Sequence, residues 1–324
     1  MIFLRGFHVF VFVSGICALV EPGSAAEYPI RPIRLIVASA AGGAPDISAR
    51  TIAGQLSKQI GQQVVIDNRP GASGVIGYDL IAKAPADGYT IGYSSSIMTT
   101  IPSLIGRLPF DPSRDFQPLI MQSFTVNVIA VNTGLPVNSV QGLIDHARAN
   151  PAKLFFGSSG TGGSQHLSME LFKSMTGTQL VHVPYKGIQQ AITDAIGGQV
   201  HIVCDNMSSI RPHVTAGRIR GLAVTSPKRS HVLPDLPTIA EAGVPGYEAM
   251  PWGGYILPAR TPRDIVARLN AEINTVLTAP AVTERFTSFG SVLVGGTPEY
   301  FRDYILSDIA KWAKVIKEAG IKPE

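Results

Sequence analysis

The 324-residue sequence contains little charge and almost no cysteine. Charged residues make up 15% of the chain, whereas an average domain has about 25%. The net charge of +4 is spread over single or paired basic residues, and no basic block alternates with aromatic residues. Nucleic-acid binding requires a basic patch or stripe, so this distribution argues against it.

Motifs for metals and nucleotides are missing as well. The histidines beyond residue 26 have neither H-x-x-x-H nor H-E-x-x-H spacing, and no C-x-x-C pair occurs. A metal site is therefore not expected. The glycine-rich segment 157–163 lacks the lysine of a P-loop, and no G-x-G-x-x-G opens a helix. We expect neither a nucleotide nor any other cofactor.

The first 26 residues are typical of a secretory signal peptide. Arg5 precedes an apolar run over residues 7–20, and Ser24-Ala25-Ala26 provides a small-residue cleavage site. The run is shorter than the roughly 20 apolar residues of a membrane-spanning helix, which makes the alternative of a membrane anchor less favourable. We expect cleavage before Glu27 and export of the remaining chain to the periplasm.

Removal of this segment also removes Cys17 and leaves Cys204 as the one cysteine of the mature chain. An intramolecular disulfide is then impossible, even in an oxidising compartment. Stability must come from apolar burial, and 45% of the residues are hydrophobic. A mature chain of about 300 residues allows one large core or two smaller ones, and we expect two domains.

Buried-strand patterns alternate with helical patterns twice along the chain. The expected strands are 33–38, 64–66 and 89–93 in the first unit and 154–156, 179–183 and 200–204 in the second. Such alternation predicts parallel strands joined by helical crossovers. The predicted fold class is α/β with two lobes, each a mainly parallel sheet flanked by helices.

Two extended apolar segments, 126–131 and 249–257, separate the units. If the C-terminal helices that follow pack on the first unit, the chain crosses between the lobes twice and forms a hinge. The predicted division is 27–126 with 250–324 for lobe 1 and 127–249 for lobe 2.

A glycine-bearing loop follows the first strand of each unit, at residues 39–45 and 157–163. Each loop leads into a helix, where backbone N–H groups and the helix dipole suit a carboxylate or a phosphate. In open parallel sheets, ligands also bind beyond the carboxyl ends of the strands. A tight turn that needs glycine explains either loop alone equally well, but two loops at matching places favour a binding site.

Three polar residues lie near these loops, and two of them have two interpretations each. Asp46 is expected to cap the helix after the first loop. His166 either faces a ligand or packs within its helix. Asp205 follows an expected strand and either accepts a hydrogen bond from a ligand or caps the next helix.

A secreted serine hydrolase that acts on a small ester or amide is the alternative function. The segment 157–161 misses the last glycine of G-x-S-x-G, and His166 follows Ser159 too closely for a nucleophile elbow. We therefore expect a binding protein without catalytic residues.

An ordered series of short motifs runs through the mature chain. It comprises Tyr28-Pro29, Gly42-Gly43 with Asp46 and Arg50, Asn68-Arg69-Pro70-Gly71, Asp87-Gly88-Tyr89-Thr90, Val183-Pro184-Tyr185-Lys186-Gly187, Gly198-Gln199-Val200, Leu222-Ala223-Val224-Thr225 and Leu236-Pro237-Thr238-Ile239 through Gly243. The series resembles the Bug family, the tripartite tricarboxylate transporter substrate-binding receptors, over nearly the whole mature chain. The resemblance implies a type II periplasmic-binding-protein fold that closes around a small carboxylate, such as a dicarboxylate, an aromatic acid or an amino acid.

The resemblance also implies a site. One ligand carboxylate is held by main-chain groups and ordered water between loops 40–46 and 158–166, and Tyr185 and Asp205 border the distal part of the ligand. The predicted ligand-binding residues are Ser39, Ala41, Gly42, Gly43, Asp46, Ser96, Ser158, Gly160, Thr161, Gly162, Ser164, His166, Tyr185 and Asp205. The expected partner is a membrane permease of the tripartite tricarboxylate type or a sensor, and the receptor is expected to be a monomer.

The first loop departs from the family pattern. The family usually has proline near Ala38 and Ala41 and an aromatic residue near Ser39. Smaller side chains here open volume for a bulkier or aromatic acid, unless another loop fills it.

Overall fold

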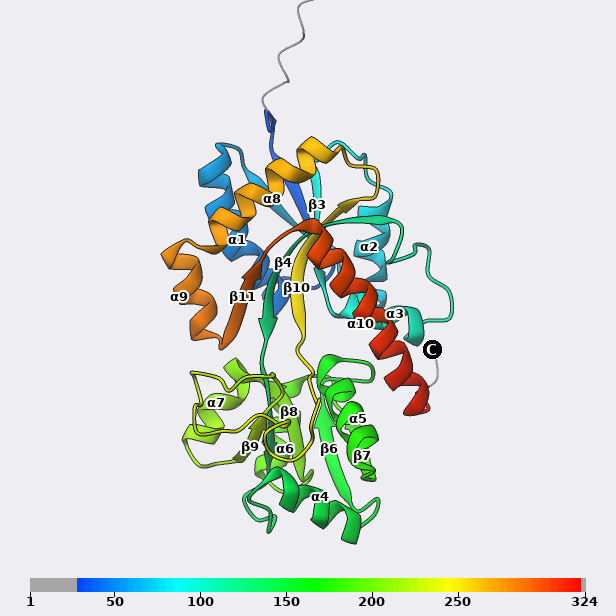
Figure 1. Cartoon of the computed structure of the whole chain (residues 1–324), viewed down its shortest axis with the longest axis vertical. Coiled ribbons are helices and arrows are strands. Elements are labelled where there is room, and N and C mark those ends of the chain that lie inside the picture. The colour runs from blue at the N-terminus through cyan, green and yellow to red at the C-terminus, as the bar shows by residue number, and fades with distance from the viewer. Residues whose placement is uncertain (1–27, 322–324) are drawn as a thin grey trace, which may run out of the picture.

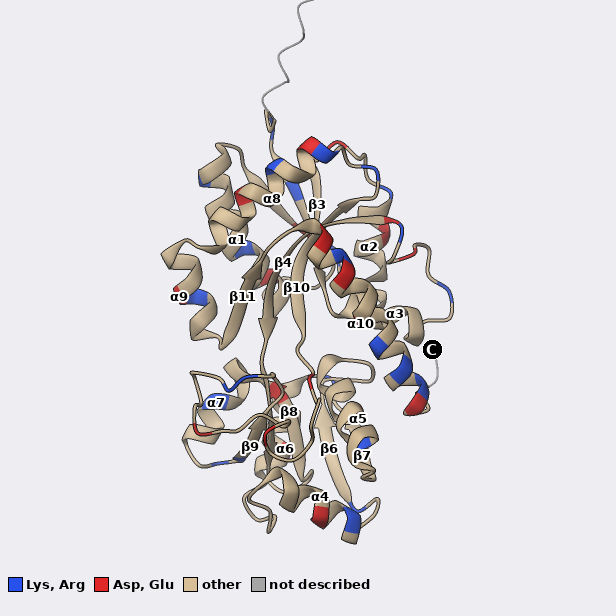
Figure 2. Cartoon of the chain, viewed as in Figure 1, with Lys and Arg blue, Asp and Glu red and all other residues tan. Residues whose placement is uncertain are grey.

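The computed structural model describes residues 28–321 as two α/β lobes arranged along the long axis of the molecule (Figure 1). The predicted signal segment and its cleavage site lie outside the described residues. Basic and acidic residues are scattered over both lobes in the view of Figure 2. None of the helices within 28–321 has the length and apolar character needed to cross a membrane.

Lobe 1 contains a six-stranded sheet in the order β11-β4-β10-β3-β1-β2. Its strands are β1 (Ile33–Val37), β2 (Val64–Asn68), β3 (Thr90–Ser95), β4 (Phe116–Thr125), β10 (Trp252–Pro258) and β11 (Ser291–Gly295). Its helices are α1 (Ala44–Ile60), the 3-10 turn η1 (Ala72–Gly74), α2 (Val75–Ala82), α3 (Ile97–Leu104), α8 (Arg263–Leu277), α9 (Pro280–Ser288) and α10 (Pro298–Glu318).

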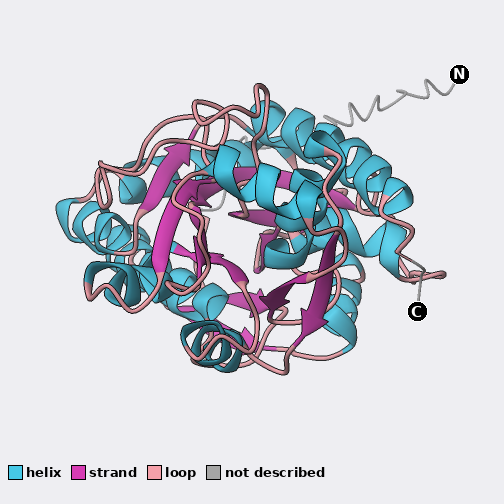
Figure 3. Cartoon of the chain, turned by 90° about the horizontal axis from the view of Figure 1, so that it is seen from below, coloured by secondary structure: helices cyan, strands magenta, loops and turns pink. Residues whose placement is uncertain are grey.

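Lobe 2 contains a five-stranded sheet in the order β7-β6-β8-β5-β9. Its strands are β5 (Asn127–Val131), β6 (Leu154–Ser158), β7 (Leu180–Pro184), β8 (Ile202–Asn206) and β9 (Arg220–Val224). Its helices are α4 (Val140–Ala149), α5 (Ser164–Thr176), α6 (Ile188–Ile196) and α7 (Met207–Thr215). Helices surround the strands when the molecule is viewed from below (Figure 3).

Both sheets are mixed, and their parallel parts are the units that the sequence predicts. In lobe 1, β1 pairs in parallel with β2 and β3, and in lobe 2, β6 pairs in parallel with β7 and β8. The antiparallel pairs arise from the segments that connect the lobes. Because β4 leaves lobe 1 and β10 returns to it, the two strands run side by side in opposite directions.

The chain passes between the lobes at two places. Strand β4 ends at Thr125 and β5 begins at Asn127, so the first crossing lies at Val126. On the return path, the Ala249 N–H group still donates to Thr225 O of lobe 2, whereas Pro251 O accepts from the Thr125 N–H group. From these bonds we propose 126/127 and 249/250 as the lobe boundaries.

Helix α10 makes a third connection between the lobes. Its N-terminal half places Phe301 and Ile305 in a core of lobe 1, and its C-terminal half places Trp312 and Ile316 in the core of lobe 2. The helix has 21 residues, which gives a length of about 32 Å and allows it to reach both lobes. The predicted division assigns residues 250–324 entirely to lobe 1. The C-terminal end of α10, in contrast, packs in the core of lobe 2.

Four elements of lobe 1, α3, β4, α9 and β11, have no counterpart among the elements predicted from the sequence, and α9 and β11 show why. Helix α9 buries only Val282 and Phe286, and β11 buries only Gly295. With so few buried positions, neither segment repeats an apolar pattern often enough to identify an element in the sequence. Strand β11 forms because β4 supplies its hydrogen-bond partners.

We expect Trp312→Ala to lower the free energy of unfolding by about 3 to 5 kcal/mol, because it removes a large buried side chain from the core of lobe 2. Trp312 is 6% exposed. Lys314→Ala, on the exposed face of the same helix, should change it by less than about 0.5 kcal/mol. Equilibrium unfolding in urea measures both values. Equal stability of the two variants would contradict the contact between α10 and lobe 2.

Candidate functional site

The loop before α1 is held by a hydrogen bond from its own glycine. Gly42 has a φ of +81°, which residues other than glycine rarely adopt. Its N–H group donates to Asp46 Oδ2 at 2.8 Å. The predicted capping role of Asp46 is corrected here: Gly43 is the N-cap, and Asp46 is the third residue of the helix. Its side chain reaches back to the loop instead.

The loop before α5 has the same geometry. Gly162 has a φ of +76°, and its N–H group donates to His166 Nδ1 at 3.0 Å. Gly163 is the N-cap of α5, and His166 is again the third residue of the helix. The two loops therefore use one arrangement, in which an aspartate and a histidine play equivalent parts.

Asp46 is ionised in this arrangement. The hydrogen bond from Arg50 Nε, at 2.9 Å, is the largest cause that lowers the pKa of Asp46 to about 2, and the bonds from Gly42 and Asn68 act in the same direction. The carboxylate is 2% exposed and its oxygens are occupied by these donors, so it serves to hold the loop.

Four helices begin at the space between the lobes. The N-caps of α1 and α5 are glycines, and those of α3 and α7 are Ser96 and Asn206; none of the four has a side-chain capping bond. An uncapped helix start exposes N–H donors and carries a partial positive charge. The arrangement therefore suits a negatively charged group.

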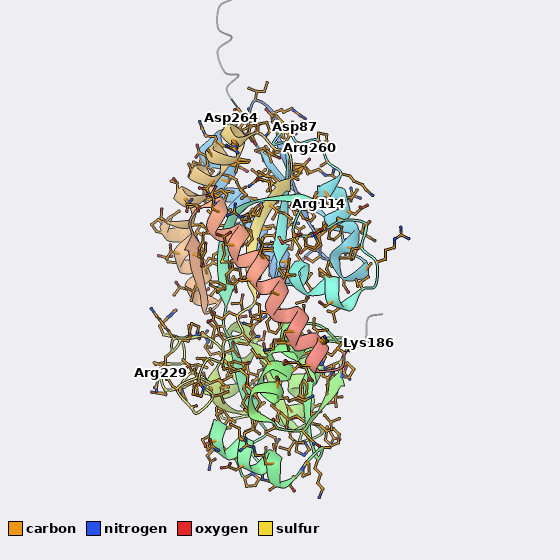
Figure 4. The ribbon with its side chains drawn as sticks, turned by 45° about the vertical axis from the view of Figure 1, so that its right-hand side comes forward. Asp87, Arg114, Lys186, Arg229, Arg260 and Asp264 are labelled. Atoms are coloured by element: carbon orange, nitrogen blue, oxygen red, sulfur yellow. The ribbon has the colours of Figure 1, made fainter. Side chains whose placement is uncertain are left out.

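A cavity of about 400 Å³ lies where these helices begin. Its lining includes Ala44 and Pro45 of α1, Ser96, and Ser164 and Gln165 of α5. None of the described residues that line it is acidic, basic or histidine. Among the charged residues labelled in Figure 4, Asp87, Arg260 and Asp264 lie at the end of lobe 1 that is remote from lobe 2.

A larger hollow of about 670 Å³ lies on lobe 1 between α8 and α10. Neither glycine loop contributes to its lining. The cavity between the lobes is the better candidate, since helix starts from both lobes meet there.

Comparison with known proteins identifies the family. A family model described as "Tripartite tricarboxylate transporter family receptor" matches residues 48–321. The chain belongs to this receptor family. The resemblance seen in the sequence motifs is thereby confirmed.

Relatives match the receptor over nearly its full length. Protein BugT of Bordetella pertussis is 38% identical over 316 residues, which cover 97% of this chain and 96% of BugT. An R. palustris protein solved with adipate is 42% identical, with a TM-score of 0.79 and coverage of 92% of this chain and 100% of that one. The periplasmic binding protein BugD is 32% identical, with a TM-score of 0.76 and coverage of 92% and 100%. The predicted two-lobed α/β fold is confirmed.

A partly buried stack of rings packs beneath the second loop of the receptor. The ring centroids of His166 and His182 are 3.8 Å apart and the rings are nearly parallel, and the Phe156 ring lies 4.9 Å from His182 and 6.1 Å from His166. Ser158 Oγ lies 2.7 Å from His182 Nε2. The hydroxyl also donates to Gly160 O and accepts from the Gly160 N–H group.

Burial keeps His182 neutral. Burial, reinforced by the neighbouring His166, lowers the pKa of His182 to about 4. Burial opposes ionisation of Glu170, yet hydrogen bonds from His166 and Lys173 outweigh it and lower the Glu170 pKa. The base of the second loop is thus a closed network within lobe 2.

The structure places the sequence-predicted site residues in three groups. Those that line the cavity are Ser96 and Ser164. Those that lie in the two glycine loops beside it are Ser39, Ala41, Gly42, Gly43, Gly160, Thr161 and Gly162. Those whose side chains form hydrogen bonds with backbone groups of the loops are Asp46, Ser158 and His166.

Tyr185 and Asp205 lie outside the cavity lining. The Tyr185 hydroxyl donates to Asp194 Oδ2 at 2.9 Å. Asp205 is fully buried, and its Oδ1 accepts from Gln165 Nε2 at 3.1 Å. Burial raises the pKa of Asp205. Gln165 therefore separates this carboxyl group from the cavity.

Several lining residues were not found from the sequence. Gln165 follows the predicted Ser164 at the start of α5. Its position in the sequence could therefore have identified it as a lining residue. Tyr93 and Trp252 lie on the strands β3 and β10, which pair with each other. Phe289 follows α9 and has no local signal, because only the packing of α9 brings it to the cleft.

Neither serine of the second loop has the geometry of a nucleophile. Ser159 Oγ donates to Gln165 Oε1 at 3.1 Å. Ser158 contacts His182, but it is fully buried, and its Oγ is also within hydrogen-bond distance of Gly160 O and of the Gly160 N–H group. This geometry favours a binding site over the hydrolase alternative.

We expect Gly162→Ala to destabilise the receptor by on the order of 1 to 3 kcal/mol, since alanine is strained at positive φ. Its Cβ atom would also collide with Leu104 of α3 in the opposite lobe. Gly163→Ala is the matched control, with a φ of −68° and its nearest neighbour 3.4 Å from the added atom. Urea unfolding should show near-native stability for the control alone, and a stable Gly162→Ala protein would contradict the loop geometry.

His182 should make stability depend on pH. Its folded pKa of about 4 lies below the ordinary value near 6.5, so between these values the unfolded chain binds the proton and the folded chain does not. Stability should therefore fall as pH decreases through this window, by on the order of 2 to 3 kcal/mol from this group.

The measurement is urea unfolding at pH 7 and pH 4.5 of the wild type, His182→Gln and the exposed control His231→Gln. His182→Gln should lose less stability on acidification than the other two proteins. Equal losses in all three would exclude the buried neutral histidine.

Proposed function

We propose that this receptor is a periplasmic solute-binding protein that captures a small carboxylate between its two lobes. The observation that carries the proposal is the convergence of uncapped helix starts on a cavity without charged lining residues. In such a cavity, negative charge is met by backbone N–H groups, hydroxyls and bound water. The adipate bound to the R. palustris relative supports the same ligand class.

We assign two roles to the predicted site residues. The backbone N–H groups of Ala41, Gly43 and Thr161 and the hydroxyls of Ser96 and Ser164 contact the carboxylate, whereas the N–H groups of Gly42, Gly160 and Gly162 are bonded within their own loops. Asp46, Ser158 and His166 shape the loops without touching it, and Asp205 acts on the ligand only through Gln165. Tyr185 supports the second lobe beside the loop.

The receptor binds without catalysis in this proposal, and it uses no cofactor. The hydroxyl of Ser159 is paired with an amide, and that of Ser158 is enclosed. Its ligand passes to a membrane permease of the tripartite tricarboxylate type, or alternatively to a sensor, and the receptor acts as a monomer. The family name and the predicted signal over residues 1–26 support this role.

Carboxylates should bind and their carboxamides should not, because the amide lacks the charge that the helix starts attract. Thermal-shift screening followed by calorimetric titration tests this with acid and amide pairs. A ligand at about 100 times its dissociation constant should add roughly 2.7 kcal/mol of stability. It should also be recovered unchanged.

Side-chain changes at the site should separate backbone recognition from a salt bridge. Ser164→Ala should weaken binding by roughly 0.5 to 3 kcal/mol, whereas Gly43→Asp adds like charge at the site and should abolish it. Lys186→Ala, at an exposed lysine, is the control and should bind normally. If Gly43→Asp binds like the wild type while Lys186→Ala or Arg50→Ala does not, a basic side chain holds the carboxylate and the proposal fails.

A further inference from the structure

The two lobes contribute different chemistry to the cavity. Lobe 1 provides all of the large apolar side chains, which are Ile47, Tyr93, Ile97, Trp252, Phe286 and Phe289, together with the hydroxyls of Ser48, Ser95, Ser96, Thr125 and Ser291. Lobe 2 provides only small or polar ones, which are Ser159, Gly163, Ser164, Gln165, Asn206 and Ser208. A ligand that fills this cavity therefore meets an apolar wall, formed by these six side chains, on the lobe 1 side alone, and hydrogen-bonding groups from both lobes.

The apolar wall extends across lobe 1. Phe289 follows α9 and Ile97 begins α3, and these two helices lie on opposite sides of the lobe 1 sheet in Figure 1. Tyr93 and Trp252 lie on the strands between them. Ile97 is 36% exposed although it is apolar, and an exposed apolar surface within a cleft marks a place for a ligand.

The lining offers no cation for a second carboxylate. Arg50, on α1, already binds Asp46 at 2.9 Å and Asn68 Oδ1 at 3.2 Å. Arg285 lies over the ring of Phe289, 4.6 Å from its centroid, and is not part of the lining. A carboxylate that leaves water without a charged partner or several donors is strongly disfavoured.

The start of α7 is a poor second anion site. The Met207 N–H group already donates to Val126 O at 2.8 Å. The buried carboxyl group of Asp205 directly precedes the N-cap of this helix, and its Oδ2 has no hydrogen-bond partner among the described residues. An additional carboxylate at this end would lie close to an existing carboxyl group.

We propose that the ligand has a single carboxylate and an apolar body about the size of an aromatic ring, and that this body packs against Ile97 and Phe289. The inference rests on the proposed carboxylate-binding function and narrows it. The carboxylate lies at the starts of α1 and α5, and the body extends along the wall of lobe 1.

The test compares acids that share a carbon skeleton. Calorimetric titration of the mature receptor uses hexanoate against adipate, and phenylacetate against 1,4-phenylenediacetate. In each pair the acid with one carboxylate should bind at least about tenfold more tightly. Tighter binding of both diacids would overturn this inference and leave carboxylate capture standing. If no acid binds more tightly than its carboxamide, carboxylate capture fails as well.

Two variants test the apolar wall. Phe289→Ala and Ile97→Ser should each weaken phenylacetate binding about tenfold, as expected when a pocket loses apolar contacts. Ile97 is partly exposed, so its replacement leaves the fold intact even if Phe289→Ala is unstable. Phe155→Ala is the control, because Phe155 is equally exposed but lies on β6 outside the cavity. Unchanged phenylacetate affinity in a folded Ile97→Ser protein would overturn the proposed contact.

Arg285→Gln examines the nearest cation on α9. It should leave the preference for the acids with one carboxylate unchanged. A wild-type preference for diacids that disappears in Arg285→Gln would show that this guanidinium holds a second carboxylate, and the inference would be wrong.

Discussion

The binding cleft depends on one hydrogen bond, which occurs once in each lobe. The N–H group of a glycine in the left-handed region donates to the third residue of the following helix, from Gly42 to Asp46 and from Gly162 to His166. The bond turns each loop so that glycine, and not a capping side chain, precedes the helix. The first N–H groups of α1 and α5 are thereby left free of a side-chain cap and directed to the cleft. A charged side chain in the cavity is not needed when two helix starts face each other.

The side chains that support these loops, Asp46, His166 and His182, are charged or titratable, but they are bonded or packed within the protein and do not line the cavity. Asp46 is paired with Arg50, and His166 stacks on His182, whose pKa is lowered by burial. Their separation from the cavity explains how a receptor for anions can carry an aspartate beside its binding loop. Polar groups that are fully satisfied internally act as a rigid support.

The lobes are connected more closely than two crossing strands imply. Helix α10 contributes to the cores of both, and Leu104 of lobe 1 packs directly against Gly162 in the loop of lobe 2. Any rotation that opens the cleft must move the lobes about β4, β10 and α10 together. The glycine at position 162 is required for its backbone conformation and also for this contact.

Much of the architecture follows from local pattern. The strands predicted at 33–38, 154–156 and 179–183 are correct to within about two residues, because apolar spacing and glycine boundaries act over a few residues. The glycine loops were found for the same reason. The role of Asp46 was not predicted correctly. An aspartate just after glycines fits the pattern of an N-cap, and only the path of the loop decides that Gly43 occupies that position.

The sequence by itself determined the α/β class, the two units, the family and the loops that begin α1 and α5. The tertiary structure alone decided that α9 and β11 complete lobe 1, that α10 reaches lobe 2, and that Phe289 and Trp252 line the cavity. The reason is physical: spacing along the chain reports which face of an element is buried, whereas the cavity wall is set by contacts between segments distant in sequence. Those contacts depend on how both lobes pack, and no local pattern encodes them.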